Sequence, residues 1–148
     1  MRALLAVLMF ACASASAQTT FILVRHAEKE TGNDPVLTTA GQQRALSLVK
    51  LLEQQKVDAI YSTNFNRTKS TVKPLADAKG INIQSYEKEP DIEKLLKAGG
   101  TVVICGHSNT IPALANKLLG KQQFTNYADD DYGNLLIING ASVTHLRY

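Results

Sequence analysis

Two arginines and two histidines stand at the ends of short apolar segments in this 148-residue chain. Arg25 and His26 end the first segment, Arg67 follows the second, and His107 follows the fourth. A buried arginine and histidine are costly unless an anion matches them, and the planar fork of arginine fits the oxygens of a phosphate group. The residue types and their spacing therefore indicate a phosphate site.

The chemistry of phosphoryl transfer needs both kinds of side chain. The group in transfer carries negative charge on its equatorial oxygens, which Arg25 and Arg67 can bind with bidentate hydrogen bonds. A neutral imidazole can be the nucleophile and form a covalent phosphohistidine that water later hydrolyses. A second imidazole can donate to the phosphate, and a helix that begins near Thr110 would direct its amides toward the same anion. Nearby arginines favour the neutral form of the nucleophile.

Alternating strands and helices must position these side chains. β-branched apolar runs predict four strands, at residues 21–24, 57–61, 81–85 and 101–105. Helical periodicity predicts a helix through residues 45–52 with Thr38 as its N-cap, one over 66–79 that Gly80 stops and Pro74 kinks, a short one over 92–97, and a fourth through 111–118.

This order of elements predicts an α/β fold, a three-layer αβα sandwich around a mostly parallel sheet. Ligands of such sheets bind at the carboxyl ends of the strands, so Arg25, His26, Arg67 and His107 are expected to meet at one edge. The segments 135–138 and 141–147 predict an antiparallel hairpin at the edge of the sheet, with Asn139-Gly140 in a type I′ turn.

The first 17 residues have the features of a secretory signal peptide. Arg2 precedes an apolar stretch at residues 3–11, which is too short to span a membrane, and Ala15-Ser16-Ala17 gives a small-residue exit. Cleavage after Ala17 would leave residues 18–148 as one domain and place the protein in the periplasm or outside the cell. Lipidation of Cys12 is the alternative.

Composition excludes some partners. The formal net charge of +3 is too small to indicate nucleic acid or a membrane surface, so the expected partner is a small phosphorylated substrate or an envelope phosphate group. Cys105 lies in an apolar run and is expected to be a buried structural thiol. Metal binding is not expected, because arginines flank His26 and His107 and oppose a cation. The sequence does not indicate an oligomeric state.

Four motifs resemble those of one known family, the histidine phosphatase superfamily, whose fold is that of the phosphoglycerate mutases. They are Leu23-Val24-Arg25-His26-Ala27, Ser62-Thr63 with Arg67-Thr68, Gly106-His107-Ser108, and Leu37-Thr38-Thr39-Ala40-Gly41-Gln42. The resemblance implies a cofactor-independent and metal-independent phosphatase, with His26 as the phosphorylated nucleophile and Arg25, Arg67 and His107 as the phosphate pocket. Ala27 stands where the family more often has glycine, and the short chain resembles the family's minimal members.

The proton donor for the leaving group stays open. Larger acid phosphatases of this family place an aspartate after the second histidine, where this chain has Ser108. Mutase-like members use a glutamate after the third strand. The candidates here are Glu87, Glu89 and Asp91 in that segment, and Asp129, Asp130 and Asp131 in a later loop. A substrate whose leaving group needs little protonation, such as a phosphoramidate, is a further possibility.

Two other functions fit part of the pattern. Residues 106–110 resemble the nucleophile elbow of a serine hydrolase, with Ser108, Asp131 and His145 in the order of a triad, although Thr110 replaces the last glycine. A phosphate pocket without a proton donor could also serve a module that only binds phosphorylated ligands. His145 itself is expected to be a strand residue, and Glu28 and Lys29 a solvated loop pair.

Overall fold

A computed structural model describes residues 18–148. The expected signal peptide and Cys12 lie outside the described residues. The strands and helices occur in the predicted order. They are β1 (Thr20–Arg25), α1 (Thr39–Leu51), β2 (Ala59–Thr63), α2 (Asn66–Lys79), β3 (Ile83–Tyr86), α3 (Ile92–Ala98), β4 (Thr101–Gly106), α4 (Thr110–Leu119), β5 (Asn134–Asn139) and β6 (Ser142–Arg147).

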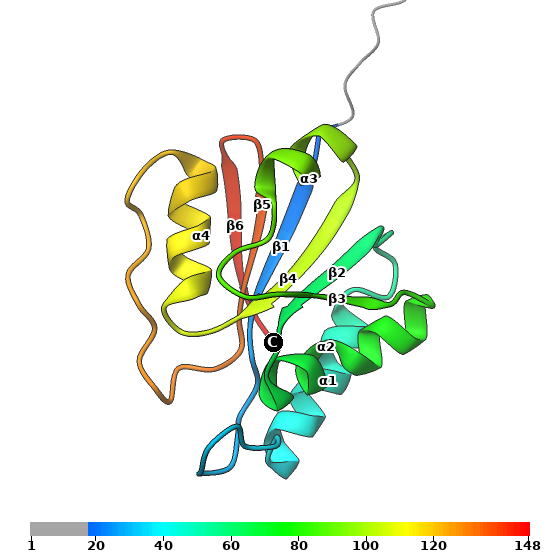
Figure 1. Cartoon of the computed structure of the whole chain (residues 1–148), viewed down its shortest axis with the longest axis vertical. Coiled ribbons are helices and arrows are strands. Elements are labelled where there is room, and N and C mark those ends of the chain that lie inside the picture. The colour runs from blue at the N-terminus through cyan, green and yellow to red at the C-terminus, as the bar shows by residue number, and fades with distance from the viewer. Residues whose placement is uncertain (1–17) are drawn as a thin grey trace, which may run out of the picture.

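The strands form one six-stranded sheet in the order β3-β2-β4-β1-β5-β6 (Figure 1). The first four strands in this order are parallel, and β5 and β6 add an antiparallel hairpin beside β1. The predicted mixed α/β fold is therefore confirmed. The connections that leave β1 and β4 run in opposite directions across the sheet. Helix α1 connects β1 to β2 toward the β3 edge, and α4 connects β4 to β5 toward the β6 edge. This arrangement opens a crevice outside the carboxyl ends of β1 and β4.

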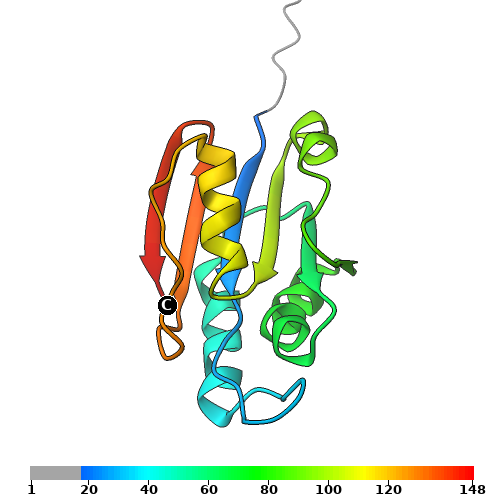
Figure 2. The same cartoon turned by 60° about the vertical axis from the view of Figure 1, so that its left-hand side comes forward.

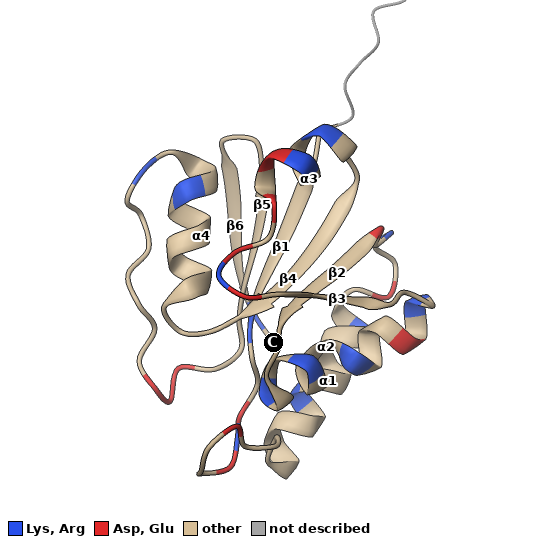
Figure 3. Ribbon diagram, in the orientation of Figure 1, with Lys and Arg blue, Asp and Glu red and all other residues tan. Residues whose placement is uncertain are grey.

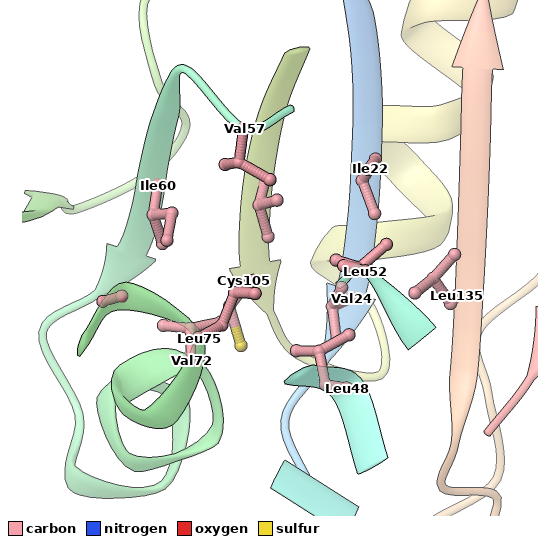
Figure 4. Close-up of a cluster of buried hydrophobic side chains, with 12 residues drawn as sticks. Ile22, Val24, Leu48, Leu52, Val57, Ile60, Val72, Leu75, Cys105 and Leu135 are labelled. Atoms are coloured by element: carbon pink, nitrogen blue, oxygen red, sulfur yellow. The ribbon is translucent and has the colours of Figure 1, made fainter. Parts of the chain in front are cut away.

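Two hydrophobic clusters cover the two faces of the sheet. Alternate residues of each strand face opposite sides, so Ile22 and Val24 of β1 pack against α1 and α2 while Phe21 and Leu23 pack on the side of α3 and α4. Figure 4 shows the first cluster, with Leu48 of α1 below β1. The helices of the two clusters cover opposite faces of the sheet, α1 and α2 on one and α3 and α4 on the other. Figure 2 shows α4 in front of the sheet after a turn of the molecule. The sandwich therefore has three layers, as predicted.

Thr38 and Gly80 have the structural roles that the sequence predicts for them. The hydroxyl of Thr38 accepts a hydrogen bond from the amide of Gly41 at 3.1 Å and caps α1. Gly80 ends α2 in the left-handed conformation, with φ of 66°. Pro74 lies inside α2, which continues through it to Lys79. The first turn of α1 packs so closely on the preceding loop that a Cβ at Gly41 would overlap the carbonyl oxygen of Glu28.

The predicted turn type of the terminal hairpin is wrong. Asn139 pairs with Ser142, so the two central residues are Gly140 and Ala141 instead of Asn139 and Gly140. Only Gly140 has a positive φ, at 58°, whereas a type I′ turn needs two residues with positive φ. A glycine first followed by a residue with negative φ is the pattern of a type II′ turn. The hairpin itself and its antiparallel pairing are as predicted.

Charged residues lie mostly on helices and loops, and the strands carry almost none (Figure 3). One acidic stretch, residues 129–131, lies in the loop between α4 and β5 on the same side of the molecule as the carboxyl ends of β1 and β4. Among residues 18–148, no helix is long and apolar enough to cross a membrane.

Candidate active site

The register between β1 and β4 brings the two histidines together. Arg25 pairs with Gly106, and the amide of His26 donates to the carbonyl of Gly106 at 2.9 Å. The residues that follow the paired positions, His26 and His107, are therefore neighbours although 81 positions separate them in sequence. Their ring centroids lie 5.5 Å apart with the rings nearly perpendicular. Side chains this close can reach a single phosphate group.

His26 is fixed in one tautomer. Its Nδ1 lies 2.9 Å from the carbonyl oxygen of Ala27, which can only accept, so Nδ1 carries the proton. Nε2 is then unprotonated and has the lone pair that a nucleophile needs. Burial lowers the pKa of His26 to about 4; the charges of His107, Arg25 and Arg67 act in the same direction, and the hydrogen bond to Ala27 opposes the shift. The ring is therefore neutral near pH 7.

His107 is held through Nε2, the ring nitrogen that is free in His26. Its Nε2 lies 3.0 Å from the hydroxyl oxygen of Thr63, and that hydroxyl donates to Thr68 at 2.9 Å. Since the proton of Thr63 is used by Thr68, Thr63 accepts from Nε2 of His107. Nδ1 of His107 lies 3.4 Å from a terminal nitrogen of Arg67, which can only donate. Burial, with Arg67 and Arg25, lowers the pKa of His107 to about 4.

The two arginines are held by loops at the edge of the sheet. Arg67 at the start of α2 lies 3.8 Å from the carboxylate of Asp34, which also accepts from the amide of Asn66 at 2.8 Å and so caps α2. Arg25 donates to three carbonyl oxygens of the loop before β5, those of Ala128, Asp129 and Asp131 at 2.6 to 2.8 Å. The guanidinium of Arg25 also stacks on Tyr132 at 4.4 Å.

These side chains line one cavity of about 390 Å³. The four residues that the sequence predicted all contribute to it, and they bring two fixed positive charges to a space of the size of a small ligand. The remaining lining residues come from the loops after β1 and β4 and from the loop before β5: Lys29, Ser108, Asn109, Asp129 and Tyr132.

The structure separates the candidate proton donors. Asp129 lines the cavity. Glu89 pairs with Lys117 beside a different cavity, and Asp91 caps α3 by accepting from the amide of Lys94. Asp131 pairs with Arg147 at 2.6 Å. Glu87 and Asp130 are exposed and do not line the cavity.

Several residues that support the site were not predicted from the sequence. The hydroxyl of Thr71 accepts from the amide of Ala27 at 2.9 Å and donates to the carbonyl of Arg67 at 2.7 Å, which ties the His26 loop to α2. Thr71 lies one helical turn after Arg67, and this spacing is the signal that could have found it. Tyr132 and Asp34 lie in loops without periodicity, and nothing in the sequence marks them.

The prediction that Glu28 belongs to a solvated loop pair is wrong. Its carboxylate is half-buried and accepts from Nε of Arg44 at 2.8 Å, and Arg44 also donates to the carbonyl of Tyr148. The ion pair joins the loop after β1 to α1 and to the C-terminal end. Lys29 is exposed and lines the cavity. Cys105 is fully buried, and burial raises the pKa of its thiol.

The arrangement needed for a serine hydrolase is not present in residues 18–148. His145 lies in β6 and its Nε2 is 2.8 Å from Asn134, while Asp131 pairs with Arg147. No hydrogen bond joins Ser108 to His145, or His145 to Asp131. In the same part of the chain, no three His, Cys, Asp or Glu side chains are grouped to hold a metal ion.

The sequence profile of the histidine phosphatase superfamily (branch 1) matches residues 21–93. The same fold occurs in a protein described as the phosphohistidine phosphatase SixA of Agrobacterium tumefaciens, with a TM-score of 0.71 and 19% identity, covering 90% of this chain and 100% of that one. A vanadate complex of a mycobacterial glucosyl-3-phosphoglycerate phosphatase gives a TM-score of 0.70 at 13% identity, covering 88% and 97%. The profile, the fold and the paired histidines and arginines agree, and this chain belongs to the histidine phosphatase superfamily.

A curated relative, phosphoserine phosphatase 1 of Hydrogenobacter thermophilus, is 31% identical over 86 residues. The match covers 53% of this chain and 41% of the relative, so the chain spans about two fifths of that protein.

Proposed function

We propose that this protein is a phosphohydrolase that removes phosphate from a phosphomonoester or a phosphoramidate through a phosphohistidine on His26. The observation that carries the proposal is the fixed tautomer of His26, whose Nδ1 is bound to Ala27 while Arg25, Arg67 and His107 line the same cavity. The phosphatase names of the similar proteins support the reaction class.

The reaction has two displacements. Nε2 of His26 attacks phosphorus and forms a P–N bond while the bond to the leaving group breaks. Arg25 and Arg67 stabilise the charge on the equatorial oxygens, and Nδ1 of His107 faces the same anion beside Arg67. Water then attacks the phosphohistidine, breaks the P–N bond and releases inorganic phosphate. No step uses a metal ion, because the arginines supply the positive charge.

The proposed place of action is outside the cytoplasm. Residues 1–17 support this by their composition, with Arg2, an apolar stretch and small residues before position 18. Mass spectrometry of the protein recovered from the periplasm or medium, after expression of the full chain, is expected to give Gln18 as the first residue. A mature chain that begins at a lipidated Cys12, or retention of residues 1–17 in the cytoplasm, would contradict the proposal.

The test of the activity is hydrolysis of p-nitrophenyl phosphate by residues 18–148 in the presence of a chelator. This substrate has a good leaving group, so it tests the nucleophile and the phosphate pocket without depending on a proton donor. The expected result is chelator-resistant turnover that His26→Ala abolishes. His145→Ala is the matched control, since His145 is an exposed histidine of β6, and it should keep the activity.

A phosphohistidine survives alkali, so a quench in base during turnover should trap phosphate on His26. Wild-type protein that binds vanadate but does not turn over the substrate would instead identify a module that only binds phosphorylated ligands. Turnover that persists in His26→Ala would remove His26 from the mechanism.

A further inference from the structure

Asp129 is the one carboxylate among the residues that line the His26 cavity. It shares this cavity with both histidines and both arginines. Asp129 is exposed, as are Glu87 and Asp130, but neither Glu87 nor Asp130 lines this cavity. The remaining acidic side chains that the sequence offered are engaged elsewhere. Asp131, two residues further on, is bound to Arg147, and Glu89 is bound to Lys117. The carboxylate of Asp129, in contrast, forms no hydrogen bond or ion pair with any residue from 18 to 148.

The loop that carries Asp129 is fixed on both sides of it. Arg25 donates from one terminal nitrogen to the carbonyls of Ala128 and Asp131, and from the other to the carbonyl of Asp129 itself at 2.8 Å. The side-chain amide of Asn134 also donates to the carbonyl of Asp131 at 2.9 Å. The backbone of Asp129 is thus held by the same arginine that lines the phosphate cavity, and its position relative to His26 is set by the fold.

Nucleophile and carboxylate reach the cavity from different directions. His26 follows β1, Arg67 begins α2, and Asp129 comes from the loop before β5, whose backbone is bound to Arg25. An in-line displacement needs the leaving oxygen on the face of phosphorus opposite the nucleophile. A carboxyl group that lines the same cavity, on a loop held by hydrogen bonds, can give the leaving oxygen its proton.

We propose that Asp129 is a catalytic residue that protonates the leaving group, an inference that rests on the proposed function. In the first displacement the proton of the Asp129 carboxyl passes to the leaving oxygen as its bond to phosphorus breaks. In the second, the carboxylate takes a proton from the water that attacks the phosphohistidine. Asp129 and His26 return to their starting states, and the products are an alcohol and inorganic phosphate.

The test compares substrates with different leaving groups. p-Nitrophenolate leaves readily without a proton, whereas the alkoxide of glycerol 2-phosphate does not. We expect Asp129→Asn to lower kcat/KM for glycerol 2-phosphate by about a hundredfold or more, and to lower kcat/KM for p-nitrophenyl phosphate by less than about fivefold. Asp130→Asn is the matched control, because it makes the same change in the same loop outside the cavity, and it should leave both values within about twofold.

The outcomes separate this inference from the function it rests on. Wild-type protein that is inactive on both substrates would overturn the phosphohydrolase itself and the role of Asp129 with it. Wild-type activity on p-nitrophenyl phosphate alone would overturn only the role of Asp129. A working proton donor should allow hydrolysis of alkyl phosphate esters, whose leaving groups need a proton. Equal losses on both substrates in Asp129→Asn, or an equal effect of Asp130→Asn, would also overturn it. Vanadate affinity and the melting temperature of each variant show whether the pocket is intact.

Discussion

The two histidines of the cavity use different ring nitrogens in their hydrogen bonds to the protein. His26 is bound through Nδ1 to a backbone carbonyl, and His107 is bound through Nε2 to the hydroxyl of Thr63. His26 therefore has Nε2 free for chemistry, whereas Nδ1 of His107 faces a terminal nitrogen of Arg67 at 3.4 Å. Under the proposed function, Nε2 of His26 is the nucleophile, and Nδ1 of His107 donates to the bound phosphate when it carries a proton.

Burial lowers the pKa of both His26 and His107 to about 4, from an ordinary value near 6.5. Between these values the unfolded chain binds more protons than the folded one. The free energy of unfolding therefore rises with pH through this window, and the rise ends above about pH 6.5. NMR titration of the imidazole protons, assigned with His26→Ala and His107→Ala, should show two midpoints near 4. Midpoints near 6.5 would contradict the burial argument.

The hydrogen-bond chain from His107 through Thr63 to Thr68 makes Thr63 a positioning residue. Thr63→Val keeps the shape of the side chain but removes the acceptor for Nε2 of His107. We expect kcat/KM for p-nitrophenyl phosphate to fall by roughly three- to tenfold, the cost of one hydrogen bond, and vanadate affinity to fall with it.

Thr63→Ser restores the hydroxyl and should recover most of the activity. Thr144→Val, an exposed threonine of β6, is the control for the loss of a hydroxyl. If Thr63→Val has normal kinetics, the orientation of His107 does not depend on its hydrogen bond to Thr63.

The contact between α1 and the loop after β1 holds the segment that follows His26 in place. The amide of Thr38 donates to the carbonyl of Glu28 at 3.0 Å, and Gly41 faces the same carbonyl without a side chain. Gly41→Ala places a methyl group against the carbonyl oxygen of Glu28. We expect a loss of about 1–3 kcal/mol in the free energy of unfolding.

Urea denaturation followed by circular dichroism measures this change. Gln43→Ala, at an exposed position of the same helix, is the control and should be neutral within about 0.5 kcal/mol. A neutral Gly41→Ala would mean that the loop can move away from α1, and the close packing would then not fix the position of His26.

Elements were easier to predict than their contacts. The strands and helices followed from period and from caps such as Thr38 and Gly80, because these signals are local in sequence. The ion pair between Glu28 and Arg44 joins a loop to a helix 16 residues away, and no local pattern indicates it. The turn at Gly140 was assigned one residue early, because Asn-Gly is a strong hairpin signal in itself and the register depends on cross-strand pairing.

The hydrophobic core contains a buried thiol whose reactivity can report on global unfolding. Cys105 lies in β4, is fully buried, and has a thiol whose pKa burial raises. In residues 18–148 it is the one cysteine. We expect no reaction with a thiol reagent in the native protein, and reaction in urea with the same midpoint as the loss of circular dichroism. Rapid stoichiometric labelling without denaturant would show that the sheet opens locally at β4.

The convergence of the candidate site was predictable, whereas its loops were not. Parallel strands end at one edge, so Arg25 and His107 had to lie near each other once the strand order was right. The loop before β5 has no periodicity and its contacts with Arg25 are backbone contacts, to which side-chain types give no clue. The sequence therefore does not decide which of the six acidic residues is the proton donor. The fold distinguishes Asp129 from its neighbours because Asp129 lines the cavity.

The hydrogen bonds from Arg25 to this loop limit how substrate specificity can change in evolution. Three carbonyl oxygens in residues 128–131 satisfy two nitrogens of an arginine that is almost fully buried. A loop of another length would leave those nitrogens without acceptors and disturb phosphate binding together with specificity. New specificity can thus arise more readily by exchange of side chains on the existing loop than by insertion or deletion within it.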